Sequence, residues 1–437
     1  MDKTYDVLIV GTGVSGLYSA LHLDPHLKIL LISKGSLDEN NTSLAQGGIS
    51  TALGQKDIKP FIKDTMLAGQ NYNHLPAVEI LAKESISTIQ HLIELGMPFD
   101  KEGDGTLSYT KEGAHSINRI VHVKDETGKF LWKTLMREVR KRNNITIIES
   151  MTFIDVMEKN NSCYGGILLT LQDDSLQFVY AKCILLATGG IGGIFKNSTN
   201  HKALTGDALS IAMKHHIEIK DLELIQIHPT GLYDNNYYGR RFLISESVRG
   251  EGGILVNERG ERFINELLPR DVVTRAITEE IHQSKLPYVF LDISFLDKEF
   301  IQKRFPLIYA KCAQIGIDIS KDPMLVIPSQ HYHMGGIQVD LDSKTSMKNL
   351  YAVGEVSCTG IHGKNRLASN SLLEGLVFSK RAALSINKEI KKINIQTDFY
   401  DAKLPHIKSI QKTYKKLLIS EIKRRYPAFH DELFDYR

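Results

Sequence analysis

Long apolar runs are missing from this 437-residue sequence, and no stretch approaches the roughly 20 residues that a membrane-spanning helix needs. The first predicted strand starts at residue 5, which leaves no space before it for a secretory signal peptide. We therefore expect no membrane segment in the chain, and any membrane attachment would have to come through a partner.

Cysteine is scarce as well, because Cys163, Cys183, Cys312 and Cys358 lie far apart without CxxC spacing. This spacing excludes a disulfide framework and a cysteine-ligated iron–sulfur cluster, and it favours a reducing, cytoplasmic environment. An excess of one charge is also absent, since 54 basic residues are interspersed with 51 acidic ones. With no basic stripe for a phosphate backbone, nucleic acid is not an expected partner.

The first patterned segment is DVLIVGTGVSGLYSALHL, at residues 6–23. Residues 5–10 and 27–33 predict two buried strands that enclose a helix in a βαβ unit. The GxGxxG motif between them consists of Gly11, Gly13 and Gly16. The first glycine makes the turn, the second lets the backbone approach a phosphate, and the third admits close helix packing. This context favours nucleotide binding over a structural glycine turn, with a pyrophosphate at the helix N-terminus.

One part of the dinucleotide fingerprint is missing. The second strand ends in Ser33 and Lys34, where an acidic residue would favour the ribose of NAD or FAD. Lys34 is also compatible with the 2′-phosphate of NADP, and both residues are compatible with an ordinary solvated loop. The motif predicts a fold and leaves the nucleotide open.

Two later segments, KCILLATGGIGG (182–193) and MKNLYAVGEV (347–356), repeat a short apolar run that ends in glycine. Parallel strands that lead into a ligand crevice have this pattern. We predict an α/β fold with a discontinuous Rossmann-like domain and, for this length, at least one further domain. The predicted division is 1–221 and 333–400 for the nucleotide-binding domain, 222–332 for an inserted α+β capping domain, and 401–437 for a short helical C-terminal segment.

The loop NNTSLAQGGIS, at residues 40–50, offers hydroxyls, an amide and exposed backbone donors that suit the edge of an isoalloxazine ring. Here the sequence resembles the flavoprotein subunits of fumarate reductase and succinate dehydrogenase, and within that family the branch that oxidises L-aspartate. The matching segments are SLAQGGIS, LLATGGIGG, TGDALSIAM, IQIHPTGLY, ESVRGEGG, LPRDVVTRAI, SQHYHMGGI and LYAVGEVSCTGIHGKNRLASNSLLEGLV. They occur in the family's order over roughly residues 5–385, which is far more specific than the glycine motif alone.

The resemblance implies FAD, with its diphosphate on the three glycines and its adenosine near Ser33 and Lys34. The other residues that it implies in FAD binding are Thr42, Gln46, Gly47, Gly48, Ala187, Thr188, Gly189, Asp207, Glu355, Ser369, Asn370 and Leu372. Respiratory members attach FAD covalently to a histidine, and Asn41 occupies that position here. Because an amide cannot form this bond, the implied FAD is non-covalent.

Substrate carboxylates call for arginine, whose guanidinium matches a carboxylate with two parallel hydrogen bonds. The resemblance implies Gln226, His228, Ser245, His331 and Arg366 in substrate binding. By itself, His228 would more often be a core histidine bonded to the backbone. His331 and His333 alternate as on a strand, so their rings would share one face, but no cysteine or carboxylate cluster completes a metal site and no metal is expected.

Arg270 begins a helix predicted at 270–281. Without the resemblance, a salt bridge to Asp271 or another surface acid would explain it. The resemblance places Arg270 at the reacting carbon as the proton donor in fumarate reduction, and an arginine, which is a poor base at neutral pH, suits that role better than that of a base. Glu246 and Arg249 could be a pair on a helix surface, and the resemblance implies that they form a proton path to Arg270.

Glu112 lies in YTKEGAHSINR, where the aspartate-oxidising branch carries a glutamate for the substrate ammonium; by itself it would be a solvated loop acid. The implied reaction transfers the Cα hydride of L-aspartate to N5 of FAD and gives iminoaspartate, the first step of NAD biosynthesis. O₂ or fumarate would reoxidise the flavin, and quinolinate synthase would consume the imine. A soluble fumarate reductase or succinate dehydrogenase type of flavoprotein and a non-catalytic FAD-binding protein are the two alternatives.

Members of the resembled family commonly continue for roughly another hundred residues as a helical bundle, which exceeds the space in residues 402–437. None of the implied site residues falls there. We therefore expect the shorter end to affect subunit contacts more than the chemistry.

Overall fold

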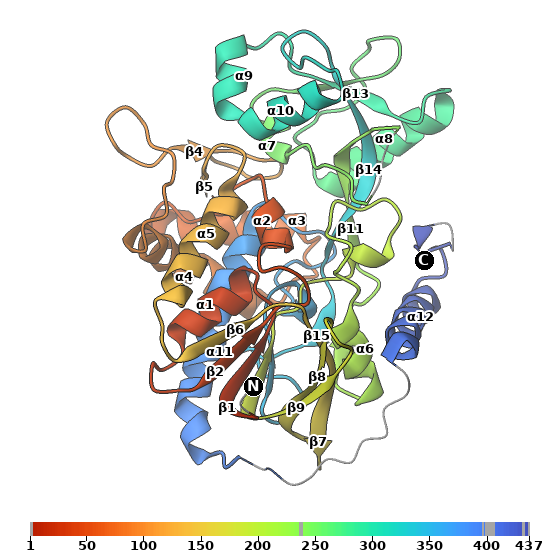
Figure 1. The fold of residues 1–437 in the computed structure, drawn as a ribbon. Coiled ribbons are helices and arrows are strands. Elements are labelled where there is room, and N and C mark those ends of the chain that lie inside the picture. The colour runs from red at the N-terminus through yellow and green to blue at the C-terminus, as the bar shows by residue number, and fades with distance from the viewer. Residues whose placement is uncertain (1–2, 236–238, 396, 398–406, 431–432, 436–437) are drawn as a thin grey trace.

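A seven-stranded mixed sheet forms the centre of the molecule in the computed structural model, which describes residues 3–235, 239–395, 397, 407–430 and 433–435 (Figure 1). The order is β6–β2–β1–β9–β8–β7, with β16 paired to the C-terminal part of β9. The parallel strands are β1 (Thr4–Val10), β2 (Ile29–Ile32), β6 (Ile145–Ile148), β9 (Leu176–Leu186) and β16 (Leu350–Ala352), and the antiparallel ones are β7 (Met151–Lys159) and β8 (Ser162–Thr170).

β1 is buried on both faces, which explains its continuous apolar run. Val7 and Ile9 belong to one hydrophobic core, whereas Leu8 and Val10 belong to the other, because successive side chains of a strand point to opposite faces. The predicted strands at 5–10 and 27–33 are thereby confirmed as β1 and β2.

Helices cover both faces of this sheet. One core contains side chains of α1 (Val14–His22), α3 (Ile58–Ala68), α4 (Leu75–Glu94), α5 (Thr127–Arg140) and α11 (Asn370–Glu389). The other contains side chains of α6 (Asp207–Lys214) and α12 (Ile407–Arg425), which lie on the opposite side of the sheet in Figure 1. This is the mixed α/β arrangement that the sequence predicts.

A second, antiparallel sheet lies above the first (Figure 1). Its order is β11 (Ile225–Leu232), β14 (Met324–His333), β13 (Val289–Asp292) and β12 (Ile254–Val256). The helices around it are α7 (Glu246–Gly250), α8 (Arg270–Gln283), α9 (Lys298–Arg304) and α10 (Pro306–Gln314). A separate hydrophobic core fills this part. We call residues 222–332 the capping region; the helix predicted at 270–281 is confirmed as α8.

Short elements surround the junction between the two sheets. They are α2 (Asn41–Leu44), the three strands β3 (Ile49–Ser50), β5 (Ile120–Val121) and β4 (Tyr109–Thr110), and the three strands β10 (Ile219–Lys220), β15 (Gly336–Gln338) and β17 (Ser357–Cys358).

The C-terminal helix α12 packs into the structure. Leu418 and Ile422 are fully buried, and α12 lies against α6. A Cβ atom at Gly206 would collide with the side chain of Leu418, so glycine there permits the close approach. This helix lies within the helical C-terminal segment predicted at 401–437, of which residues 401–406, 431–432 and 436–437 lie outside the described residues.

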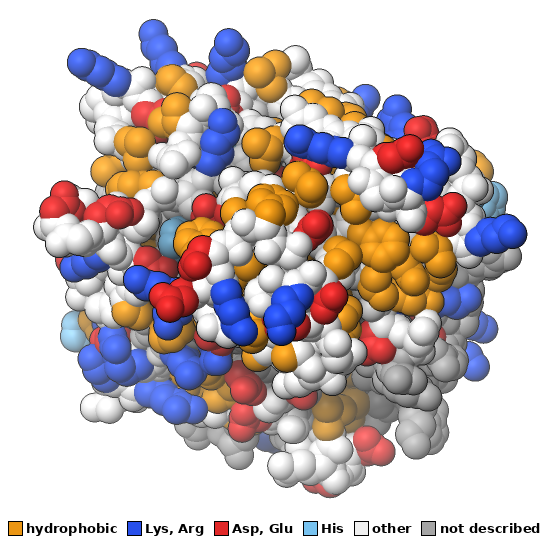
Figure 2. Space-filling view, turned by 90° about the horizontal axis from the view of Figure 1, so that it is seen from above, with side chains coloured by type: hydrophobic (Ala, Val, Ile, Leu, Met, Phe, Trp, Pro, Cys, Tyr) orange, Lys and Arg blue, Asp and Glu red, His pale blue; other side chains and the backbone are white. Residues whose placement is uncertain are grey.

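The surface carries both signs of charge. Seen from above the capping region, lysine and arginine side chains alternate with aspartate and glutamate (Figure 2). None of the described helices is both long enough and apolar enough to cross a membrane.

Candidate active site

One pocket lies where the parallel strands end beneath the capping region, and most of the predicted site residues line it. Those from the lower part of the molecule are Gly11, Gly13, Ser33, Lys34, Thr42, Gln46, Gly47, Gly48, Glu112, Ala187, Thr188, Gly189, Asp207, Glu355, Arg366, Ser369 and Leu372. The capping region contributes His228, Ser245, Glu246, Arg270 and His331. The carboxyl ends of parallel strands are the usual place for a ligand crevice in this fold class.

The glycine turn after β1 fits a pyrophosphate. Gly11 has φ of +116°, and a Cβ atom there would collide with the carbonyl oxygen of Ala187. Gly13 precedes α1 without a side-chain cap, so the helix N-terminus is open towards the pocket, although Thr42 Oγ1 accepts the N–H of Val14 at 2.9 Å. Gly16 does not line the pocket, and a Cβ there would strike the Gly11 carbonyl, which agrees with a packing role. Open amides at a helix N-terminus suit an anion.

An acidic side chain is present at the end of the pocket near Ser33 and Lys34, but it comes from another element. Lys34 Nζ lies 2.7 Å from Oδ2 of Asp207, the first residue of α6, and 2.9 Å from Oγ1 of Thr205. The sequence predicts both charged residues at the cofactor and gives no sign that they pair. A carboxylate thus lies beside the end of β2 in the pocket, although β2 itself carries none.

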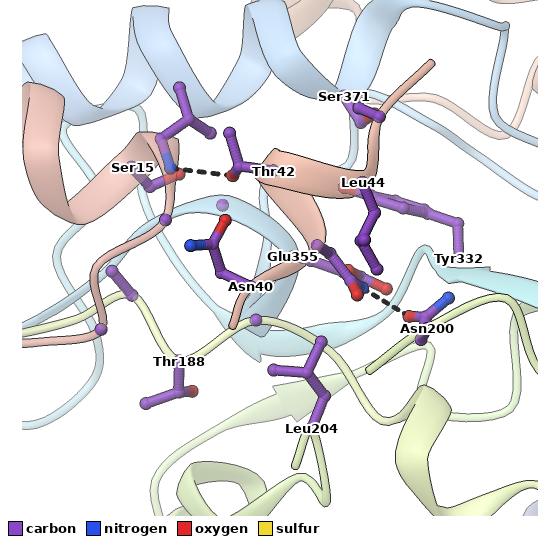
Figure 3. Close-up of a pocket in the computed structure, with 18 of the residues that line it drawn as sticks. Ser15, Asn40, Thr42, Leu44, Thr188, Asn200, Leu204, Tyr332, Glu355 and Ser371 are labelled. Atoms are coloured by element: carbon purple, nitrogen blue, oxygen red, sulfur yellow. Dashed lines mark hydrogen bonds between the residues drawn. The ribbon is translucent and has the colours of Figure 1, made fainter. Parts of the chain in front are cut away.

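Gln46 and Glu355, both predicted at the flavin, line the pocket with polar groups. Oε1 of Gln46 is buried without a hydrogen-bond partner, as a group kept for a ligand would be. Burial raises the pKa of Glu355 to about 7, and its carboxylate accepts the N–H of His333 at 3.0 Å. Side chains from separate segments, including Thr188, Leu204 and Glu355, surround the same space (Figure 3).

Both polar atoms of the Asn41 side chain form hydrogen bonds with residues 200–201. Its Nδ2 donates to Oδ1 of Asn200 at 2.7 Å, and its Oδ1 accepts the N–H of His201 at 3.0 Å. The side chain where covalent relatives place histidine thus has both polar atoms in use. These residues and the open glycine cradle fit a dissociable FAD.

Two arginines from different parts of the molecule meet in the pocket. Oε1 of Gln226 accepts from Nη1 of Arg270 at 2.8 Å and from Nε of Arg366 at 3.3 Å, although Gln226 itself does not line the pocket. Arg366 also donates to Ser371 Oγ at 2.6 Å and lies 4.6 Å above the ring of Tyr332. Burial and the charge of Arg270 lower the pKa of Arg366 to about 10, so it stays protonated at neutral pH.

Glu246 joins two guanidiniums. Its Oε2 accepts from Arg270 Nε at 2.5 Å and lies 3.3 Å from Nη2 of Arg249. Burial raises the pKa of Glu246, but these two cations outweigh it and hold the pKa below its ordinary value. Arg249 is 1% exposed and does not line the pocket. The interpretations as a surface helix pair and as an Arg270–Asp271 bridge are therefore wrong.

Glu112 is a buried carboxylate, 2% exposed, and not a solvated loop acid. It accepts hydrogen bonds from Ser369 Oγ at 2.5 Å and from Ser247 Oγ at 2.9 Å. A Cβ atom at Gly47 would lie 2.7 Å from its Oε1, so the carboxylate rests on the backbone of the predicted flavin loop. Burial, and next the charge of Glu246, raise the pKa of Glu112.

The two pocket histidines are neutral. Burial, together with the nearby arginines, lowers the pKa of His228 and of His331 well below the ordinary value. Nδ1 of His228 accepts the N–H of Thr230 at 3.2 Å, so its proton is on Nε2, which is buried without a partner. His228 therefore has an unsatisfied N–H donor in the pocket. His331 packs edge-on against it, with ring centroids 5.0 Å apart.

His333 does not share this site. Its Nε2 bonds to the carbonyl of Leu222 at 3.0 Å, and it does not line the pocket. Within the part of the chain that the structure describes, no three His, Cys, Asp or Glu residues are grouped as metal ligands.

Some residues of the site were not found from the sequence, and Asn370 joins Gly16, Gln226 and Arg249 as a predicted residue outside the pocket lining. Ser247 and Ser371 bond to Glu112 and Arg366, and Thr199 bonds to His331. Only the closeness of Ser247 to Ser245 in SESVRG could have indicated one of them. Asn370 does not line the pocket; its Oδ1 accepts from Ser50 Oγ at 2.6 Å.

Comparison with known proteins agrees with this geometry. The model of the FAD binding domain family matches residues 6–372. L-Aspartate oxidase of Clostridium perfringens is 51% identical over 99% of this chain and 98% of its own length, and that of Clostridium acetobutylicum is 53% identical over 96% of both. The enzyme of Neisseria meningitidis is 40% identical over 88% of this chain and 78% of its own.

Solved structures give the same result for the fold. A chain of Escherichia coli quinol fumarate reductase superposes with a TM-score of 0.84 at 28% identity, covering 97% of this chain and 74% of that one. Mycobacterium smegmatis Sdh1 gives 0.76 at 29% identity, covering 97% and 81%. The chain belongs to the FAD-binding flavoprotein family of fumarate reductase and succinate dehydrogenase and, within it, to the L-aspartate oxidases.

Proposed function

We propose that the pocket binds FAD and oxidises L-aspartate to iminoaspartate, with O₂ or fumarate as the electron acceptor. The observation that carries this proposal is the buried carboxylate of Glu112 in the same pocket as Arg270 and Arg366. A substrate with two carboxylates needs the two cations, and only a substrate with an additional ammonium group gains from a buried anion beside them.

Arg366, Arg270, His228 and Ser245 hold the two carboxylates in this proposal. The guanidiniums donate paired hydrogen bonds, and the neutral His228 donates from the Nε2 that is left without a partner. The carboxylate of Glu112 accepts a hydrogen bond from the ammonium group of the substrate. Binding at three points fixes which face of Cα is presented to the flavin loop.

Bound FAD supplies a two-electron acceptor that takes the hydride from Cα. Glu112 takes one proton from the substrate nitrogen, and the freed electron pair of the nitrogen forms the C=N bond as the hydride leaves. The raised pKa of Glu112 improves it as this base. Arg270, held by Glu246, donates hydrogen bonds to the adjacent carboxylate of the substrate.

Fumarate reduction is the second candidate, and one observation favours it. Arg270 is connected through Glu246 to Arg249, a buried chain that could resupply a proton given up by Arg270. The family's proton path is thus compatible with these contacts. The two activities are complementary, because fumarate serves as the acceptor for the reduced flavin in the first proposal.

The product would be consumed by an enzyme that accepts an unstable imine, and quinolinate synthase is the proposed partner in NAD biosynthesis. We propose a reducing cytoplasmic setting, which the four buried, free cysteines support. The proposed division is residues 1–221 and 333–400 for the FAD-binding domain, 222–332 for the capping domain and 401–437 for the C-terminal segment; the separate core of the capping region supports it.

Anaerobic mixing tests the function. The purified holoenzyme is mixed with L-aspartate or with succinate, and the flavin absorbance is followed. We expect bleaching by aspartate. Bleaching by succinate alone would favour the dehydrogenase-type alternative, and bleaching by neither would favour a non-catalytic FAD-binding protein.

A further inference from the structure

Asn365 lies behind the two pocket arginines and has no role in the function proposed above. It is 4% exposed and sits in the segment between β17 and α11, directly before Arg366. Its Oδ1 accepts from Gln226 Nε2 at 2.7 Å, and its Nδ2 donates to Asp271 Oδ1 at 2.9 Å. A single buried amide therefore contacts two elements of the capping region, β11 and α8.

The direction of these hydrogen bonds is fixed from both ends. Guanidiniums only donate, so Gln226 turns its Oε1 to Arg270 and Arg366 and has only its Nε2 left for Asn365. An ionised carboxylate only accepts, so Asp271 requires the Nδ2 of Asn365. The side-chain amides of Gln226 and Asn365 thus form a chain of hydrogen bonds, here called the relay, in which each donor and acceptor can be assigned in only one way. Asparagine suits position 365 because its amide has an acceptor for Gln226 and a donor for Asp271.

The relay also spans the boundary between the two parts of the molecule. Asn365 and Arg366 belong to the lower part, whereas Gln226, Arg270 and Asp271 belong to the capping region. Gln226 Nε2 further donates to the carbonyl of Arg366 at 2.9 Å. The distance between the two guanidiniums therefore depends on the hydrogen bonds that join the capping region to the segment with Asn365.

We propose that Asn365 is a positioning residue that sets the spacing of Arg270 and Arg366 for a dicarboxylate through this relay of two amides. The inference rests on the proposed function of the pocket, since it assigns the arginines to substrate carboxylates. Asn365 touches neither substrate nor cofactor; it acts through Gln226 and Asp271.

Three variants of the holoenzyme test the proposal. Asn365→Ala removes both bonds, and Asn365→Asp keeps the acceptor for Gln226 but places a second carboxyl against Asp271. Gln70→Ala is the matched control, because exposed Gln70 donates to the other oxygen of Asp271 at 3.2 Å. Asp271 on α8 contacts Asn365 directly, Arg270 reaches it through Gln226, and Lys364 and Arg366 flank it in the chain.

The measurements are dicarboxylate affinity, from the flavin absorbance change on titration with succinate, and the rate of anaerobic bleaching by aspartate. We expect Asn365→Ala to weaken succinate binding and to lower kcat/KM by about ten- to a hundredfold, as for buried hydrogen bonds to charged groups. Its affinity for FAD should stay within about twofold, because neither Asn365 nor Gln226 lines the pocket, and Gln70→Ala should match the wild type.

The pH dependence of succinate binding in Asn365→Asp distinguishes a positioning role from a purely structural one. At high pH two facing carboxylates repel, and binding should be as weak as in Asn365→Ala. As the pH falls, one shared proton restores a donor to Asp271, so binding should recover along an ionisation that the wild type lacks. A pH profile like that of the wild type, or unchanged succinate affinity in Asn365→Ala, overturns the proposal. Because succinate binding is measured without turnover, failure of aspartate to bleach the wild type refutes the proposed function separately.

Discussion

Replacing Glu112 with glutamine removes one negative charge from the pocket and keeps the shape of the side chain. Ser247 and Ser369 both donate to the carboxylate, and the amide oxygen of glutamine can still accept from one of them. The variant should fold, because a neutral amide is less costly to bury than a carboxylate. What is lost is the anion that binds the substrate ammonium and takes a proton from it, so the loss estimated below from the hydrogen bond alone is a minimum.

The size of the effect follows from burial. A hydrogen bond between charged groups in a site this enclosed is worth about 1.5–3 kcal/mol, which corresponds to about ten- to a hundredfold in kcat/KM for aspartate. Fumarate has no ammonium group and makes no such hydrogen bond with Glu112. The rate at which fumarate oxidises the reduced flavin should therefore change by less than about threefold. Glu112→Gln should therefore separate the two half-reactions.

The assay is anaerobic stopped-flow absorbance, with aspartate reducing the flavin and fumarate oxidising it. The control is Glu251→Gln, which changes an acid that accepts from Thr110 next to the same loop at 3.0 Å but does not line the pocket. In the wild type, aspartate oxidation should rise with pH through the raised pKa of Glu112, because the carboxylate is the active form, and the glutamine variant should lack this limb. Equal losses in both half-reactions would refute the role of Glu112 in binding ammonium.

The cofactor site gives three further predictions. Acid precipitation should leave the yellow colour in the supernatant, because Asn41 cannot bond covalently to FAD; colour in the pellet would contradict this. Gly11→Ala should abolish FAD binding in a fluorescence titration, since its Cβ would collide with the Ala187 carbonyl at a φ of +116°; near-normal affinity would contradict the cradle. Asp207→Asn should weaken FAD binding by about tenfold, as expected for one charge-assisted hydrogen bond from a ribose hydroxyl, while Lys34 loses its ion pair and keeps Thr205. An unchanged Kd would remove Asp207 from the site.

The sequence was sufficient to predict those helices and strands that depend on local patterns of residues. β1 and α1 follow from an apolar run, a glycine turn and helical spacing, all within residues 4–22. The pocket residues came from the family resemblance, because contacts between distant segments leave no periodic pattern. Ser369 reaches Glu112 from 257 residues away, and no local rule connects them.

The same limit explains the incorrect alternatives. Glu246 and Arg249 are three residues apart, a spacing that is usually found on a solvated helix face. Here α7 is only five residues long and is buried at the junction, so the pair faces inward. Burial of a short helix is decided by what packs over it, which its own five residues do not encode.

The close contact between Gly206 and Leu418 gives the C-terminal helix a share in the cofactor site. Gly206 lines the pocket and directly precedes Asp207, while Leu418 presses on it from α12. An element that props one wall of a binding site is thermodynamically linked to its ligand, and the linkage is reciprocal. FAD binding should therefore stabilise the docked position of α12, and loss of α12 should weaken the affinity for FAD by the same free energy.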